Sequence, residues 1–263
     1  KIVKFSGIGL HNNEICNVTI KPSQDGIKIN HIPISPFYVN NTAGMTTISK
    51  YSQVEHLMSA LNALKIDNVD IFVDNNELPI MDGCSRIFVD KLKDIVVPID
   101  KPKQFLNINQ EVLVEMGESY IKYTPTNNNY LEIECIVDFP YVGEQRYIWK
   151  NNNFNDYYHN ISNATTFFWD NQLKSVKNNG GAKGVNQSNT IILTSSNSIY
   201  FNNNEFAKHK LLDMIGDICS LNFNGKITSY RPGHLINNMF AKEIMNKSLY
   251  NMKVPFITLP NFN

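Results

Sequence analysis

The stretch HKLLDMIGD, residues 209–217, places polar side chains within a largely apolar helical pattern. Apolar residues at positions 206, 211, 212, 214, 215 and 218 would be spread around most of a helix that turns by about 100° per residue. We therefore expect this helix to be buried on nearly all sides. His209, Asp213 and Asp217 follow one another at steps of four, so their side chains should form one polar strip along it.

A buried carboxylate needs a cation, a metal ion or several hydrogen-bond donors. For His209 and Asp213 alone, a satisfied polar pair inside a core is the more frequent explanation. The tripeptide VEH, residues 54–56, offers a second imidazole next to a carboxylate, although Glu55 and His56 could also be a helix-capping glutamate beside a solvated histidine. Two histidines and one aspartate with an open fourth position form the ligand pattern of catalytic zinc. Glu55 would then take a proton from water.

A further histidine lies in RPGHLINN, residues 231–238, where His234 follows Pro-Gly at a predicted helix start. It could be a helix-capping or exposed side chain, which is common. It could also be a general acid, kept protonated by a neighbouring carboxylate. Asp217 lies one helical turn beyond Asp213 and is the candidate for that carboxylate.

Composition limits the class of protein. The chain has 263 residues, enough for one large or two modest domains, with a net charge of +0. A neutral chain lacks the basic footprint of most nucleic-acid-binding proteins, so we expect no nucleic-acid partner. Its four cysteines form no C-x-x-C pair, and we expect them to be reduced. No apolar run approaches the about 18 residues of a membrane span.

The order of strand and helix patterns predicts an α+β fold of two similar domains, each a layered sandwich of sheet and helices. The prolines of VVPIDKP, residues 96–102, suggest a boundary, which gives domains at 1–99 and 100–263. In the first domain we predict a hairpin of residues 17–22 and 25–30, a helix over 53–65, a strand over 68–74, and a glycine turn followed by a short helix within 77–92. Ser52 and Glu55 would form a capping box for the first helix.

In the second domain the patterns predict strands over 105–116, 119–125, 131–139, 189–194 and 226–233, and helices over 156–178, over 205–222 and from 234 onwards.

Six blocks of the sequence carry a family resemblance: GIGLH (7–11), VEHLMSAL (54–61), IDNVDIFVD (66–74), ELPIMDGCSRIFV (77–89), EFAKHKLLDMIGD (205–217) and GHLINN (233–238). They resemble the UDP-3-O-acyl-N-acetylglucosamine deacetylases of lipid A biosynthesis, occur in the family's order and span nearly the whole chain. The resemblance implies an active site between the two domains and Zn²⁺ as the cofactor.

The resemblance also implies roles for individual residues. It implies zinc ligands at His56, His209 and Asp213, a general base at Glu55 and a general acid at His234 that Asp217 orients. Thr166 matches a threonine that helps to hold the oxyanion, and Lys210 matches a lysine that binds substrate or stabilises charge. From the sequence alone, Lys210 could equally be a lysine that extends from a buried helix into water.

The substrate implied by the resemblance is a small UDP-sugar that carries an acyl chain and loses its N-acetyl group as acetate. An insert near residues 180–194 would form an apolar passage for the acyl chain. We expect substrate contacts at Phe167, Phe168, Lys210, Gly184 and Met45, although Phe167, Phe168 and Trp169 could also belong to the core. The stretches TTFF (165–168), KGVN (183–186) and NN (12–13) depart from the family pattern, and these departures affect the acyl passage rather than the zinc ligands.

Two other functions remain open at this point. One is a catalytically weakened relative that binds a nucleotide sugar or lipid, and the other is an α+β protein whose His/Asp cluster is structural and holds no metal. We expect a monomer without a membrane span. We expect it in the cytoplasm, or alternatively in a eukaryotic organelle after removal of a targeting segment.

Overall fold

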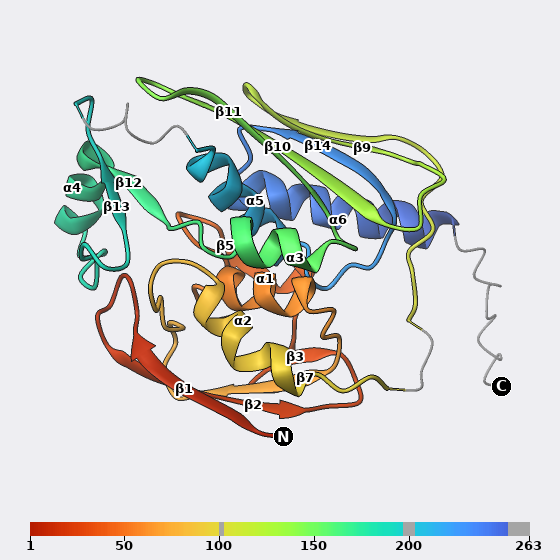
Figure 1. Cartoon of the computed structure of the whole chain (residues 1–263), viewed down its shortest axis with the longest axis horizontal. Helices are drawn as coiled ribbons and strands as arrows, with labels where there is room; N and C mark the ends of the chain where they lie inside the picture. Colours follow the sequence, from red (N-terminus) through yellow and green to blue (C-terminus); the bar gives the residue numbers. More distant parts are fainter. Residues whose placement is uncertain (100–102, 197–202, 252–263) are drawn as a thin grey trace, which may run out of the picture.

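Two five-stranded sheets enclose two layers of helices in the computed structural model, which describes residues 1–99, 103–196 and 203–251 (Figure 1). The first sheet, at the bottom of Figure 1, has the order β1-β2-β7-β3-β4, with bounds Val3–Ile8, Ile15–Pro22, Val69–Val73, Ile27–Ile29 and Ile32–Pro33. The second sheet, at the top, has the order β11-β10-β14-β9-β8, with bounds Gly143–Lys150, Leu131–Phe139, Gly225–Tyr230, Ser119–Thr124 and Val112–Met116.

The two sheets share one strand arrangement. In each, the first two strands form an antiparallel pair, and the last strand in the sequence lies between the second and the third. That last strand runs parallel to the third strand, as β7 does to β3 and β14 to β10. The predicted α+β fold of two similar layered units is thereby confirmed. The boundary at 96–102 stays a prediction, and its residues 100–102 lie outside the described part of the chain.

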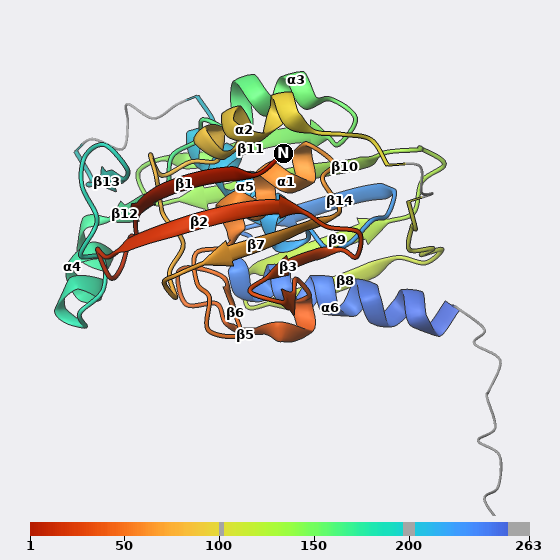
Figure 2. The same cartoon turned by 90° about the horizontal axis from the view of Figure 1, so that it is seen from below.

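The inner layers contain the longer helices and short helical turns. Their bounds are α1 Glu55–Ala63, α2 Arg86–Leu92, η2 Lys93–Ile95, α3 Phe154–Asp156, a π-helical turn η3 Tyr157–Ile161, α5 Glu205–Asp217 and α6 His234–Asn251. Figures 1 and 2 both place α1 and α5 between the sheets, where α5 packs on α1, α6 and β10. One continuous apolar core joins the two units.

The central helix α5 is buried along nearly its whole length, as its pattern predicts. Phe206, Leu211, Leu212, Met214 and Ile215 are all fully buried. Amphipathic alternation places the outer strands in the same way. In β2, the alternate residues Cys16, Val18 and Ile20 face the core, because successive side chains of a strand point to opposite faces.

A glycine sets how closely α5 approaches α1. A Cβ atom added at Gly216 would lie 2.1 Å from the carbonyl oxygen of Glu55, so only glycine fits this crossing. The close approach brings the first turn of α1 next to the last two turns of α5.

We expect Gly216→Ala to lower the unfolding free energy by about 1–3 kcal/mol or more, because the added methyl group must push two backbones apart. Thermal unfolding followed by circular dichroism measures this effect. Gly233→Ala is the matched control, since an added Cβ atom there meets no atom within 4 Å. Equal melting temperatures for the two variants would contradict the packing argument.

The predicted hairpin of residues 17–22 and 25–30 is wrong. Both segments contain strands, β2 and β3, but β7 lies between them and pairs with both. Alternation identifies a strand and its buried face but not its partner, and here a strand more than 40 residues downstream takes the place between them.

The predicted capping box at the start of α1 is also wrong. The helix begins at Glu55 after Val54, and no side chain caps it. Ser52 is held elsewhere, because its backbone bridges to Glu77 and its hydroxyl donates to the Asn76 carbonyl. The side chain of Glu55 accepts a hydrogen bond from the backbone of Thr46 instead.

The single helix predicted over 156–178 is two helical segments with a strand between them. The turn η3 ends at Ile161, the strand β12 covers Phe167–Trp169, and the helix α4 covers Asp170–Asn178. Strand β12 pairs in parallel with β13, Ile191–Leu193, which confirms the strand predicted over 189–194 in shortened form. Together β12, α4 and β13 form a small unit at the left of Figure 1.

Other bounds differ by smaller amounts. Strand β11 was not predicted, β8 covers only the end of the segment 105–116, β14 ends at Tyr230, and α5 ends at Asp217 rather than near 222. A short two-stranded sheet of β5, Val39–Asn41, and β6, Thr47–Ile48, follows a 3₁₀ turn η1 at Pro36–Tyr38. Among the described residues, no helix combines the length and apolar character needed to cross a membrane.

Candidate metal centre and catalytic site

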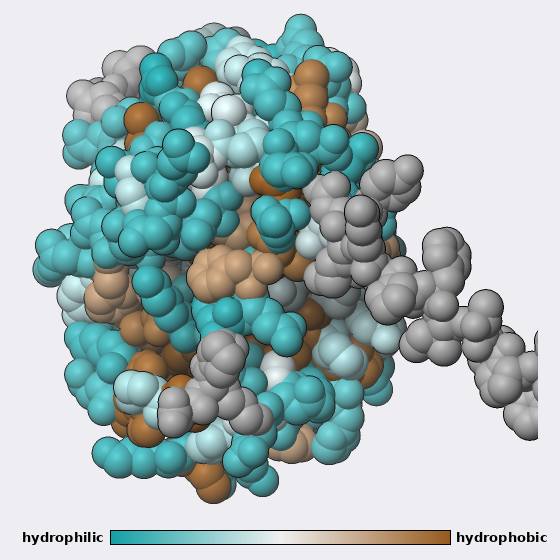
Figure 3. Space-filling model, turned by 90° about the vertical axis from the view of Figure 1, so that its right-hand side faces the viewer, coloured by the Kyte–Doolittle hydropathy of each residue, from teal (hydrophilic) through white to brown (hydrophobic). Residues whose placement is uncertain are grey.

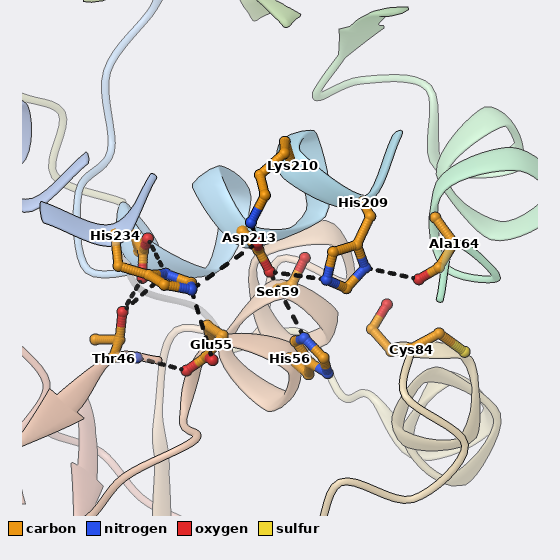
Figure 4. A network of polar contacts seen from close by, with 12 residues as sticks. Thr46, Glu55, His56, Ser59, Cys84, Ala164, His209, Lys210, Asp213 and His234 are labelled. Atoms are coloured by element: carbon orange, nitrogen blue, oxygen red, sulfur yellow. Dashed lines mark hydrogen bonds and ion pairs between the residues drawn. The ribbon is translucent and has the colours of Figure 1, made fainter. Parts of the chain in front are cut away.

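The crossing of α1 and α5 gathers the chemically active side chains. Glu55 and His56 form the first turn of α1, and their residues are only 2% and 3% exposed. His209 and Asp213 face them from one strip of α5, as the spacing of four residues predicts, and are equally buried. Side chains more than 150 positions apart in the sequence thus meet in one buried place (Figure 4).

Three ligand atoms converge in this place. Asp213 Oδ1 lies 3.6 Å from His56 Nε2 and 3.5 Å from His209 Nε2, and the three residues have ligand atoms that all lie within 4.8 Å of one another. In a tetrahedral site with ligand bonds of about 2.0–2.1 Å, neighbouring ligand atoms lie about 3.4 Å apart. The group His56, His209 and Asp213 could therefore hold a metal ion.

The hydrogen bonds of these residues fit a metal ion. Asp213 Oδ1 is buried and has no hydrogen-bond partner among the described residues, which is costly for a carboxylate oxygen that no cation satisfies. His209 Nδ1 donates to the carbonyl oxygen of Ala164 at 2.9 Å. That bond fixes the tautomer with its lone pair on Nε2, the atom that faces Asp213.

The electrostatic environment favours the protonation states that metal ligands need. Burial lowers the pKa of His209 to about 4, against the opposing charge of Asp213, so its imidazole is neutral. Burial alone would raise the pKa of Asp213, but the charges of Lys210 and His209 hold it well below its usual range. A neutral imidazole and an ionised carboxylate are the forms that bind metal ions.

His234 and Asp217 form a charged pair beside the three ligand residues. His234 is the first residue of α6, and its Nδ1 donates to Asp217 Oδ2 at 2.9 Å. Burial opposes a positive charge, but Asp217, Asp213 and Glu55 outweigh it and raise the pKa of His234 to about 9. His234 Nε2 then lies 3.9 Å from Glu55 Oε1 and 4.0 Å from Asp213 Oδ2.

Glu55 has one bound and one available oxygen. Its Oε2 accepts a hydrogen bond from the backbone N–H of Thr46 at 3.0 Å, and its Oε1 points toward His234. Burial raises the pKa of Glu55, although the charge of His234 opposes this effect. A carboxylate with a raised pKa is suited to accept a proton near neutral pH.

A cavity of about 720 Å³ opens onto this place. The predicted site residues in its lining are Glu55, His56, Thr166, Phe167, Phe168, His209, Lys210, Asp213 and His234. Asp217 reaches the cavity only through His234. Met45 and Gly184 do not line it, and the Gly184 N–H instead donates to the carbonyl oxygen of Leu10, where the insert packs on the β1–β2 loop.

Lys210 and Thr166 lie at the wall of the cavity. Lys210 Nζ donates to Asp213 Oδ2 at 2.9 Å and lies 5.4 Å from the centre of the Phe167 ring. The half-buried Thr166 precedes β12, and its backbone is fixed by hydrogen bonds with Gly83 and Ile191. Its hydroxyl is thus held on a rigid segment of backbone.

The sequence patterns did not identify three residues that support the site. They are Ala164, whose carbonyl binds His209, Asn237, whose amide donates to Asp217 Oδ2 at 2.8 Å, and Thr46, which contacts both Asp217 and His234. Asn237 lies three residues after His234, so the helical period could have indicated it. No local signal marks Thr46 or the carbonyl of Ala164.

A larger cavity, of about 1000 Å³, lies between the end of the first sheet and the segment that links the two sheets. Figure 3 shows the end of the molecule where that segment passes, with apolar side chains exposed in patches within a mainly hydrophilic surface. Its lining holds lysines and Asp67 but no histidine, cysteine or glutamate. The smaller cavity, and not the larger one, therefore has the residues for catalysis.

Comparison with known proteins agrees with this site. A sequence profile of the family described as UDP-3-O-acyl N-acetylglycosamine deacetylase matches residues 1–246. Proteins named UDP-3-O-acyl-N-acetylglucosamine deacetylase are 33% identical in Nautilia profundicola, over 95% of this chain and 91% of the relative, and 33% identical in Campylobacter jejuni subsp. doylei, over 96% and 92%. The protein of that name in Haemophilus ducreyi is 31% identical over 93% of this chain and 88% of its own length.

Proposed function

The chain belongs to the UDP-3-O-acyl N-acetylglycosamine deacetylase family, and from this premise we propose that it removes the N-acetyl group of UDP-3-O-acyl-N-acetylglucosamine. The reaction breaks the amide C–N bond by hydrolysis, releases acetate and commits the sugar to lipid A. The observation that carries the proposal is the convergence of His56, His209 and Asp213 within reach of both Glu55 and His234.

Zinc is the proposed ion. Two imidazole nitrogens and one carboxylate oxygen, with a further position open toward a cavity, are the donors typical of catalytic zinc sites. When bound, zinc supplies a Lewis acid that lowers the pKa of water to about 7 and polarises a carbonyl group.

The residues of the chain divide the proton transfers between them. Glu55 Oε1, the oxygen not engaged by Thr46, takes the proton of the attacking water. His234, protonated and held by Asp217, gives a proton from Nε2 to the departing amine nitrogen. The hydroxyl of Thr166 donates to the oxygen that becomes negative in the tetrahedral intermediate.

Other cavity residues bind the substrate. Lys210 brings a positive charge to the wall of the cavity and attracts the anionic UDP-sugar. Phe167 and Phe168 offer an apolar surface to the acyl chain, beside the small unit of β12, α4 and β13. Met45 and Gly184 stay predicted contacts outside the lining of the cavity. The monomeric state and the cytoplasmic location stay predictions as well.

Acetate release from UDP-3-O-acyl-N-acetylglucosamine by the purified chain tests this function. We expect turnover that a chelator abolishes and that added Zn²⁺ restores. Turnover that persists in full after removal of all metal would contradict the metal-dependent mechanism. A chain that binds the substrate and one equivalent of zinc without releasing acetate would be a weakened relative, and the proposed activity would be wrong.

A further inference from the structure

Thr46 lies where the two halves of the catalytic apparatus meet. It follows the β5–β6 turn, just before β6, and is only 4% exposed. Its hydroxyl oxygen lies 2.5 Å from Asp217 Oδ1 and 3.2 Å from His234 Nδ1 (Figure 4). These partners are 171 and 188 positions away in the sequence, so the contact joins the two units of the fold.

The hydrogen-bond roles within this cluster follow from a single proton. A threonine hydroxyl has one proton, and Thr46 donates it to the carboxylate of Asp217, which can only accept. Toward His234 the Thr46 oxygen can therefore only accept, so Nδ1 must carry a hydrogen, shared with Asp217 Oδ2 at 2.9 Å. Nε2 is then the ring nitrogen that faces Glu55 and the cavity.

The backbone of Thr46 is tied to the other proton-transfer residue. Its N–H donates to Glu55 Oε2 at 3.0 Å, and its carbonyl oxygen accepts from the N–H of Val54 at 3.4 Å. The start of α1 and the start of α6 are thus connected through one side chain and its own peptide groups. The separation of Glu55 Oε1 from His234 Nε2, 3.9 Å, depends on this connection.

We propose that Thr46 is a positioning residue that sets the ring orientation of His234 relative to Glu55 and thereby controls the rate of amide cleavage. It touches neither the metal ligands' converging atoms nor the lining of the cavity. This inference rests on the proposed function, because it assumes that Glu55 and His234 transfer protons in turnover.

Thr46→Val tests the hydroxyl alone, because valine keeps the shape of the side chain and the backbone N–H that binds Glu55. We expect kcat to fall on the order of 10- to 100-fold, as is typical when a residue that orients a catalytic group is lost, with KM nearly unchanged. Thr46→Ser keeps the hydroxyl and should retain most of kcat. Thr47→Val, the same change at the next buried position, is the matched control and should keep kcat.

A double-mutant cycle separates positioning from a general loss of structure. If Thr46 acts through His234, Thr46→Val should have almost no further effect on kcat in a His234→Ala background. Full additivity of the two losses would overturn the proposal, and so would a Thr46→Val variant with wild-type kcat.

A third measurement does not depend on turnover. The Nδ1–H proton of His234 should give an NMR signal, assigned by its absence in His234→Ala. We expect this signal to shift or broaden in Thr46→Val and to persist in Thr46→Ser. An unchanged signal in Thr46→Val would overturn the positioning role even if the proposed deacetylation were confirmed. A changed signal in a chain without deacetylase activity would instead contradict only the proposed function.

Discussion

Glu55→Gln is expected to lower kcat about 10²- to 10⁴-fold, the usual contribution of a general base, while the chain keeps its metal ion. Glutamine has nearly the size of glutamate, and its amide oxygen can still accept the hydrogen bond from the Thr46 backbone. The variant therefore loses the ability to accept a proton and little else. Steady-state acetate release, together with metal analysis of the same preparation, measures both quantities.

Glu134→Gln provides the matched control for Glu55→Gln. Glu134 is also a buried glutamate, but it lies on β10, where it pairs with Arg146 and Lys226 away from the cavity. We expect that variant to keep its kcat. If Glu55→Gln retained kcat within a few-fold of the unmodified chain, Glu55 would not be the base.

His209→Ala is expected to cause the largest loss of metal. It removes one of three converging ligand atoms, so the affinity should fall by more than the roughly 10- to 100-fold typical of losing a residue that only hydrogen-bonds a ligand. Competition with a zinc chelator of known affinity measures the change, and turnover should fall in parallel at limiting zinc.

His159→Ala is the control for this variant, since His159 is an exposed histidine far from the three ligand residues along the chain. Its metal affinity should match that of the unmodified chain. A His209→Ala variant that still folds and binds one ion with undiminished affinity would show that His209 is not a ligand.

The parts of the site on regular elements could be predicted from the sequence. A helix repeats every 3.6 residues, so the spacing of His209 and Asp213 determines that they share one side of α5. The family resemblance supplied the partners in α1 and α6, and the structure brings all of these residues together. Thr46 was not predicted, because its contacts depend on how a short turn of the first unit meets two helices of the second.

The fold shows the same division between local pattern and long-range pairing. Alternation identified β2, β3 and β7 as strands, yet β7 separates the two strands that were expected to pair. Ser52 has the residue type of a helix cap but is engaged by the neighbouring segment at Asn76. The helix predicted over 156–178 failed because the aromatic run Phe167–Trp169 pairs with β13, a partner that the local sequence does not reveal.

X-ray absorption at the zinc edge, on the purified chain loaded with Zn²⁺, tests the metal centre most directly. We predict one zinc ion per chain, bound by two imidazole nitrogens and at least one oxygen, with no sulfur ligand. The four cysteines are all free and buried, so a sulfur signal would place the ion elsewhere. A sulfur ligand, or a zinc content far below one per chain, would contradict the assignment of His56, His209 and Asp213.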